Sequence, residues 1–279
     1  MAEALIGTSW LARIAFITGV IILFYVMLRL GLIILGLVFE KSRSPMLLKG
    51  MIDGNVSKTV EQDPTKAESK PIFRSDNENM GIEYTYSVWI HLDSAEINNN
   101  NTGIKHIFNK GDNNSTVSSD YMNNNGPGLY LNVTENGDNN EVDVDLQVLV
   151  DLFNSSSANN ANPIVVKNLT FDKWICIILR AQSKTFDVFI NGVLIHREIF
   201  SDIIKQNYGN VYMAQQLGNG STGFAGKISN LKYYDKAIGT TEIVNIVKGG
   251  PDLTYLGNNT LNTKPTYFST SWYTSNMTS

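Results

Sequence analysis

The residues with the clearest potential for chemistry are three carboxylates spaced two apart, at Glu141, Asp143 and Asp145. If this segment is a β-strand, alternation places all three side chains on one face of a sheet. A retaining glycosidase needs two carboxyl groups about 5–5.5 Å apart, one as the nucleophile and one as the acid and base. The triplet therefore suggests glycoside hydrolysis as one interpretation, and a solvated acidic strand face as the other.

Other reactive side chains show no catalytic arrangement. His91, His106 and His196 do not have the spacing of metal ligands, and Cys176 lies in a continuous apolar segment, typical of a buried small hydrophobe. A Gly-x-Ser-x-Gly elbow and a phosphate-binding loop are both absent from the sequence. The sequence predicts no catalytic, cofactor-binding or metal-binding residue and no cofactor.

Two pairs of loop residues could contribute oxygen ligands to a calcium ion. Asp112 with Asn113, or Asp138 with Asn139, offers side-chain oxygens in loops. A calcium cage needs six to eight oxygen ligands, and neither pair shows a register of further ligands around it. Whether a calcium ion or a glycan is bound is left undecided by these residues.

Composition excludes several classes of protein. The chain has 279 residues, a formal net charge of -4 and 43% hydrophobic residues, so it is long and apolar enough for a sizeable core. Nucleic acid is not expected as a partner, because no basic surface is available to neutralise phosphates. One cysteine cannot form an intramolecular disulfide, so the fold does not look adapted to an oxidising compartment.

A long apolar segment runs from Ile14 to Phe39 and is interrupted only by Thr18 and Arg29. At 1.5 Å per residue, its length of roughly 26 residues exceeds a ~30 Å hydrocarbon core. It is longer than a signal-peptide core and has no small-residue cleavage site near its end, and a buried helix would show a polar face. Residues 1–40 are therefore predicted to form an N-terminal segment and a transmembrane helix in a lipid bilayer.

Charges flanking this segment predict its orientation. Lys41, Arg43 and Lys49 follow it, whereas Arg13 is offset by Glu3 before it, so the positive-inside rule places the C-terminal portion on the cytoplasmic side. The opposite topology is suggested by several Asn-x-Ser/Thr acceptors, which also arise by chance in a chain rich in these residues. Those acceptors are Asn55, Asn100, Asn114, Asn132, Asn154, Asn168, Asn219, Asn258 and Asn276.

Residues 41–71 are predicted to be a stalk. They are charged, contain Pro45 and Pro64, and show no sustained period beyond one short helical turn near Met46 to Ile52.

From Ile82 to Leu92 apolar residues alternate with polar ones, which is the period of a β-strand. Asn191-Gly192 predicts a tight hairpin, because both residues tolerate a positive φ. Further strand-like segments are 104–108, 129–133, 142–150, 174–180, 185–190, 193–200 and 211–217. Many short strands with almost no helix predict an all-β sandwich or jelly roll, with Asn-rich surface loops.

Specific motifs strengthen this prediction. The segment Phe224–Ile228, followed by Leu231–Ile238 and by Glu242-Ile243, resembles the closing strand, turn and short helix of laminin-G-like and pentraxin-like domains in the concanavalin A-like lectin/glucanase superfamily. The matching earlier pieces are Tyr86–Ile90, Trp174–Ile178 and Phe186–Gly192. The resemblance covers residues 72–248 and implies an antiparallel jelly-roll sandwich. Gly239 departs from it, standing where the family often has a capping serine.

The resemblance does not decide the function, because the superfamily contains lectins, glycosidases, adhesion modules and structural proteins. Its glucanase branch uses a Glu-x-Asp-x-Glu pattern. Here Asp145 is one methylene shorter than the expected acid, and the strand continues without that branch's surroundings. The sequence is therefore interpreted as that of a protein that is not an enzyme.

The residues after the sandwich, 249–279, show no period but contain Tyr255, Tyr267, Phe268, Trp272 and Tyr273. A polar segment with several aromatic residues cannot bury them on itself, so it is predicted to be an extended docking tail.

An anchor, a jelly roll and a docking tail together resemble membrane-associated minor capsid proteins of large double-stranded DNA viruses. The resemblance implies a structural protein of the virion that links an internal membrane to the outer shell, with other capsid or scaffold proteins as partners. The alternatives are a membrane-anchored lectin that binds glycans and an anchored glycosidase. A lectin would be expected to have an aromatic sugar platform with nearby Asp and Asn, and the sequence does not place Tyr121 or Tyr130 in one.

Overall fold

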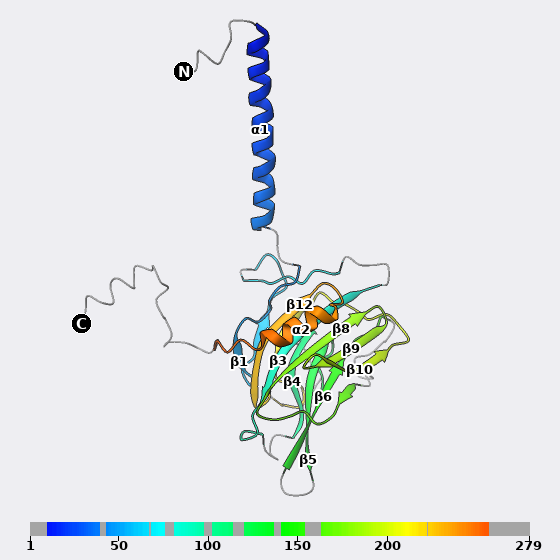
Figure 1. The fold of residues 1–279 in the computed structure, drawn as a ribbon. Coiled ribbons are helices and arrows are strands. Elements are labelled where there is room, and N and C mark those ends of the chain that lie inside the picture. The colour runs from blue at the N-terminus through cyan, green and yellow to red at the C-terminus, as the bar shows by residue number, and fades with distance from the viewer. Residues whose placement is uncertain are drawn as a thin grey trace, which may run out of the picture. The chain divides into compact units, whose positions relative to one another are not determined.

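The computed structural model describes residues 10–39, 43–66, 68–75, 81–97, 102–113, 120–136, 141–153, 163–221 and 223–256. In the first range it describes side chains only for residues 10–35, and the side chains of Asn136 and Glu141 are likewise outside the description. The chain divides into two compact units, Met1–Ser42 and Arg43–Ser279 (Figure 1).

The first unit contains one helix, α1 (Trp10–Phe39). Its 30 residues span about 45 Å at 1.5 Å per residue. The segment Trp10–Leu35 is long and apolar enough to cross a membrane, and none of its most apolar window is buried against other parts of the chain. The predicted helix is present, beginning four residues before Ile14.

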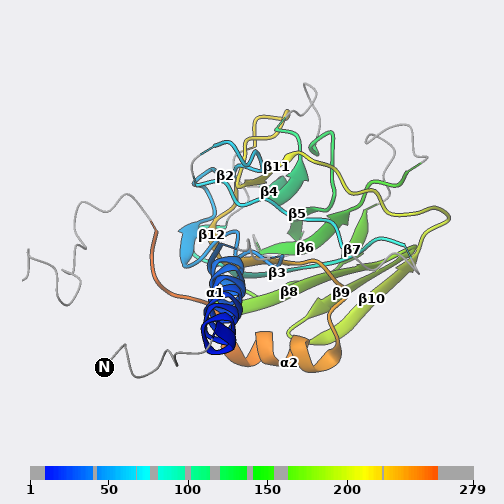
Figure 2. The same ribbon diagram turned by 90° about the horizontal axis from the view of Figure 1, so that it is seen from above.

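The second unit is a sandwich of two antiparallel six-stranded sheets (Figures 1 and 2). The first sheet, sheet A, has the order β1 (Met51–Asp53), β12 (Gly226–Tyr234), β3 (Glu83–Leu92), β8 (Trp174–Gln182), β9 (Thr185–Ile190) and β10 (Val193–Ile199). The second sheet, sheet B, has the order β2 (Lys58–Val60), β11 (Asn210–Met213), β4 (Gly103–Gly111), β5 (Gly128–Asn136), β6 (Glu141–Leu149) and β7 (Ile164–Val166). The predicted all-β antiparallel jelly roll is confirmed.

Alternation along the strands builds the core between the two sheets. On β3, Tyr84, Tyr86 and Val88 are buried with the main core, and each is followed by a residue on the outer face. The partner strand continues the pattern, because Val88 pairs with Ile177, which is also in the core. Cross-strand pairs of apolar side chains on one face are what stabilise such a sheet.

The bounds of most predicted strands lie within a few residues of the observed bounds. The stalk predicted at residues 41–71 is wrong for most of its length. Residues 51–53 form β1 on β12, and residues 58–60 form β2 on β11. Leu47 and Leu48, in the predicted helical turn, are each 1% exposed. Three-residue strands are too short to show alternation, and their partners lie more than 150 residues away.

A second helix, α2 (Thr240–Gly249), covers the outer face of sheet A (Figure 2). Its buried Ile243 packs in a cluster with Trp89, Cys176 and Phe189. Gly239 is the N-cap in an extended conformation, and no side chain caps the helix. Burial of the apolar face therefore holds α2 in place without a capping serine.

The beginning of the predicted tail is part of the sandwich. Met51 N donates to Thr254 O at 2.8 Å, and Leu256 N donates to Met51 O at 2.8 Å, so residues 254–256 run parallel to β1. Ser229 Oγ donates to the Asp252 carbonyl at 2.8 Å. Tyr267, Phe268, Trp272 and Tyr273 lie outside the described residues.

Candidate functional site

The acidic triplet lies on β6, where its two described side chains face away from the core. Asp143 is exposed and lies opposite Thr134. Asp145 is half-buried, and its carboxylate accepts a hydrogen bond from Asn168 N at 2.9 Å. The side chain of Glu141 lies outside the described part of the chain. Asp145 thus holds the segment after β7, which favours the interpretation of a solvated acidic face.

The tyrosines considered for a sugar platform are engaged with each other. Tyr130 is fully buried, and its hydroxyl donates to Asn125 Oδ1 at 2.5 Å and accepts from Met122 N at 3.1 Å. Tyr121 meets the Tyr130 ring edge-on at 5.1 Å between centroids and donates to Gln147 Oε1 at 2.6 Å. Tyr130 is therefore unable to stack on a sugar.

The three histidines lie apart on different strands. His106 on β4 is fully buried, its Nδ1 accepts from Gln215 N at 3.0 Å, and burial lowers its pKa to about 3. His91 packs against Trp174 at 5.5 Å between ring centroids, and His196 Nε2 lies 3.1 Å from a carboxylate oxygen of Glu198. Within the described ranges, no three His, Cys, Asp or Glu side chains are grouped to hold a metal ion.

Neither calcium pair is extended into a cage within the described residues. The Asp112 carboxylate accepts a hydrogen bond from the Asn124 side-chain amide, which fixes two loops together. Asp138 and Asn139 lie outside the described residues. Cys176 is buried beneath α2, and burial raises its thiol pKa to about 12, which disfavours the nucleophilic thiolate form.

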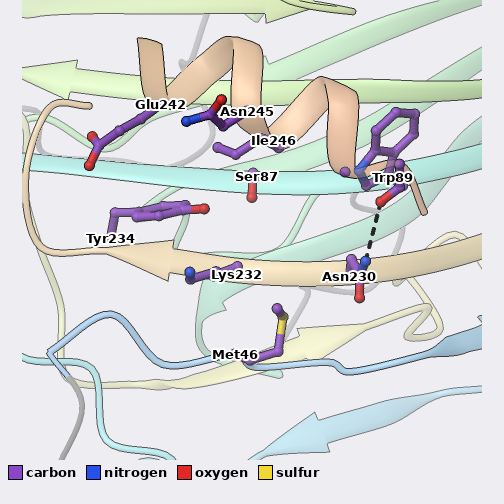
Figure 3. Close-up of a pocket in the computed structure, with 11 residues that line it drawn as sticks. Met46, Ser87, Trp89, Asn230, Lys232, Tyr234, Glu242, Asn245 and Ile246 are labelled. Atoms are coloured by element: carbon purple, nitrogen blue, oxygen red, sulfur yellow. Dashed lines mark hydrogen bonds between the residues drawn. The ribbon is translucent and has the colours of Figure 1, made fainter. Parts of the chain in front are cut away.

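The best-defined candidate site is a cavity of about 370 Å³ on the outer face of sheet A (Figure 3). Strands β3 and β12 form its floor, α2 forms one wall, and Met46 lies on the opposite side. The residues that line it are Met46, Ser87, Trp89, Asn230, Lys232, Tyr234, Glu242, Asn245, Ile246, Gly249 and Gly250.

Strand alternation explains how the cavity is formed. On β12, Leu231 and Tyr233 are fully buried in the core, so Lys232 and Tyr234 point to the outer face. The helix α2 packs over β8 and β9 through the cluster around Cys176, which leaves part of β12 uncovered. The pairing of β12 with β3 shifts register between Ser229 and Lys232, beside these residues.

The lining combines charged, amide and aromatic groups. Lys232 Nζ lies 4.5 Å from the centroid of the Tyr234 ring, a cation–π contact. Burial raises the pKa of Tyr234, and the Ser87 hydroxyl beside it opposes that shift. Glu242 accepts a hydrogen bond from Lys236 Nζ at 2.7 Å. The lining thus offers an ammonium group, a carboxylate, amides and aromatic rings to a ligand.

A smaller cavity of about 230 Å³ opens at the other end of β12, beside Phe224 and Lys105. Burial lowers the pKa of Lys105 there. Sequence reasoning singled out neither cavity, because each is lined by residues from segments far apart in the chain and contains no local motif.

Comparison with known proteins gives a family and a set of distant structural neighbours. The binding domain of botulinum neurotoxin DC in complex with SialylT is 10% identical, covers 74% of this chain and 46% of its own, and has a TM-score of 0.40. A botulinum neurotoxin type C structure, described as showing cell entry dependent on two ganglioside molecules, is 11% identical, covers 74% and 51%, and has a TM-score of 0.42. A heptameric SAP-like pentraxin from Limulus polyphemus is 12% identical, covers 74% and 88%, and has a TM-score of 0.39.

The chain spans about a third to a half of the length of the neurotoxin chains it matches. No curated protein sequence matches it. A sequence profile described as concanavalin A-like lectin/glucanases superfamily matches residues 69–244, which is more than half of the chain. The protein therefore belongs to the concanavalin A-like lectin/glucanases superfamily.

Proposed function

We propose that the protein is a non-enzymatic, membrane-anchored structural protein in which α1 spans a lipid bilayer and the sandwich makes contacts with other proteins. The observation that carries this proposal is the surface of α1, whose most apolar window is entirely unburied. Burying that surface in hydrocarbon is strongly favourable, whereas exposing it to water is not. A helix of this kind requires a lipid or protein environment.

The proposal that the protein is not an enzyme rests on the acidic residues of strand β6. The Asp145 carboxylate accepts a hydrogen bond from a backbone N–H, and Asp143 is solvent-exposed, so neither side chain lies in an enclosed apolar pocket. Both carboxylates instead belong to a solvated strand face.

The finer proposal is a minor capsid role, in which the protein links an internal membrane to the outer shell of a virion. The sandwich lies on the cytoplasmic side, as the cations after α1 favour. Residues 1–40 form the anchor, and residues 257–279 form the docking tail. Because residues 43–71 belong largely to the sandwich, the proposal does not depend on a long stalk.

Exposed apolar side chains on the sandwich support contact with a neighbouring capsid or scaffold protein. Ile199 on the edge strand β10 is 71% exposed, and Phe153 is 74% exposed. Phe153 N donates to Ile203 O at 2.9 Å, which holds Phe153 next to Ile203, another exposed apolar residue. The other exposed apolar residues of β10 are Val193, Leu194 and Ile195. An edge strand offers unpaired backbone groups as well as these side chains.

Alkaline carbonate extraction of membranes containing the full-length chain tests the anchor. The full-length protein of 31.0 kDa is expected in the membrane pellet, and the chain from Arg43 onward, as the matched control, in the supernatant. Release of the full-length chain, or a product shortened by removal of α1, would contradict the proposal.

A second candidate function is glycan binding, and the cavity beside α2 favours it. Amides, a hydroxyl, an ammonium group and aromatic rings converge there, as in many sugar sites. Glycan-array binding by residues 43–256 that Lys232→Ala abolishes, and that Lys248→Ala on the last turn of α2 leaves intact, would support the lectin. Equal binding by both variants would exclude this cavity as the sugar site.

A further inference from the structure

Between Ile14 and Phe39, the polar side chains of α1 share one face of the helix. Thr18, Tyr25 and Arg29 are separated by seven and four residues. At about 100° per residue, they fall within ~40° around the helix axis. Gly36, seven residues after Arg29, occupies the same angular position. The remaining positions from Ile14 to Phe39 are apolar, so this part of the helix has one face unlike the others.

The polar groups on this face differ in how many of their hydrogen-bond donors have a partner. The Thr18 hydroxyl donates to the Ile14 carbonyl at 2.9 Å, which makes it compatible with lipid. Arg29 Nε donates to the Tyr25 hydroxyl at 3.0 Å, and the guanidinium carbon lies 5.5 Å from the centroid of the Tyr25 ring. A guanidinium has five N–H donors. Among the described residues, Tyr25 is the hydrogen-bonding partner of Arg29, and no Asp or Glu occurs between residues 10 and 35.

The direction of the Arg29 side chain determines how deep its charge would lie in a bilayer. Arg29 lies ten residues, or about 15 Å, from the end of the apolar segment at Phe39, and farther from its beginning at Ile14. A snorkelling arginine extends toward the nearer interface. Contact with Tyr25 instead turns the guanidinium toward the N-terminus of α1 and the middle of the segment. In a bilayer this cation would lie at depth, where an uncompensated charge is costly.

We propose that this face of α1 binds a second transmembrane helix that presents an Asp or Glu carboxylate at the depth of Arg29. This inference rests on the proposed membrane anchoring. A carboxylate compensates the charge and accepts two parallel N–H bonds from the guanidinium. A second copy of α1 does not fit, because its Arg29 would repel the first and the described helix has no carboxylate. Gly36 on the same face permits close approach of a neighbouring backbone.

The test uses the full-length chain, labelled with a fluorescent donor at its N-terminus, in phosphatidylcholine vesicles. The probe is a synthetic polyleucine helix with one central Asp and an acceptor dye, compared with the same helix without Asp. Energy transfer is expected to show about tenfold tighter association with the Asp helix, in the range of polar contacts between membrane helices. Arg29→Leu should remove this preference. Arg13→Gln, which changes the other arginine of α1 near its beginning, should keep it.

Equal association with both probe helices, or an unchanged preference in Arg29→Leu, would overturn the docking proposal. Carbonate extraction of the same vesicles distinguishes a failure of the anchoring proposal from a failure of the docking proposal. A chain that resists extraction but ignores the Asp helix contradicts only the docking face. A chain released by carbonate contradicts the anchoring and the docking together.

Discussion

Removal of the N-terminal part of the sandwich should unfold it, although a family comparison begins only at residue 69. The segment before residue 69 buries four apolar side chains in the core, those of Leu47, Leu48, Ile52 and Val60. At about 1.5–3 kcal/mol for each buried side chain, their loss amounts to roughly 6–12 kcal/mol. This is comparable with the whole stability of a typical domain, about 5–15 kcal/mol. Residues 43–256 should therefore fold, whereas residues 69–256 should not.

Urea unfolding followed by the fluorescence of Trp89 and Trp174 measures this effect. Both tryptophans lie on sheet A, so they report on the sandwich. As a single-site version, Leu48→Ala should lower the free energy of unfolding of residues 43–256 by about 2–5 kcal/mol. The matched control is Val56→Ala, because Val56 is 48% exposed in the same segment and its truncation should change stability by no more than about 0.5 kcal/mol.

Two results would refute this reasoning. One is cooperative unfolding of residues 69–256 at the urea midpoint of residues 43–256. The other is a cost of Leu48→Ala no greater than that of Val56→Ala. Either would mean that the contacts of β1 and β2 add little to the sandwich.

Three further predictions concern acid stability, catalysis and the tail. Because the pKa of His106 is about 3 when folded and about 6.5 when unfolded, the unfolded chain binds a proton that the folded chain does not. The free energy of unfolding should therefore fall by about 1.4 kcal/mol per pH unit as the pH drops from 6.5 toward 3. Urea midpoints measured over this range should show a smaller pH dependence in His106→Gln and an unchanged one in His196→Gln. Residues 43–256 should not hydrolyse β-glucans, and turnover that disappears in Glu141→Gln would show the opposite. Deletion of 257–279 should leave the urea midpoint unchanged but prevent incorporation of the protein into virus particles. Deletion of 250–279 should also lower the midpoint, because Met51 loses two backbone hydrogen bonds. Normal incorporation after the shorter deletion would argue against a docking role of the tail.

Local sequence was sufficient to predict the long strands. The strand 185–190 was predicted with its observed bounds, and the alternation at 82–92 placed β3 within one residue. In both cases the signal lies within the strand itself, since a buried face imposes period two. The strand predicted at 211–217 ends earlier in the structure, at Met213, and the next residue, Ala214, adopts a positive φ.

The missed parts depend on contacts between distant residues. β1 and β2 are strands because β12 and β11 offer them open edges, and nothing in Met51–Asp53 or Lys58–Val60 encodes those partners. The cavity beside α2 was missed for the same reason. Lys232 and Tyr234 were visible only as parts of a fold motif, and their role as a cavity floor depends on where α2 stops covering β12.

The edge of sheet A formed by β1 and residues 254–256 has a mechanical consequence. Residues 46–53 run antiparallel to β12, and residues 254–256 run parallel to β1 beside it. A pulling force between the segment before Arg43 and the segment after Leu256 would therefore act along neighbouring parallel strands in opposite directions. Their hydrogen bonds would share such a load in shear, and they would not open one after another. In a protein held at both ends, this edge would resist tension better than a hairpin pulled open from its free end.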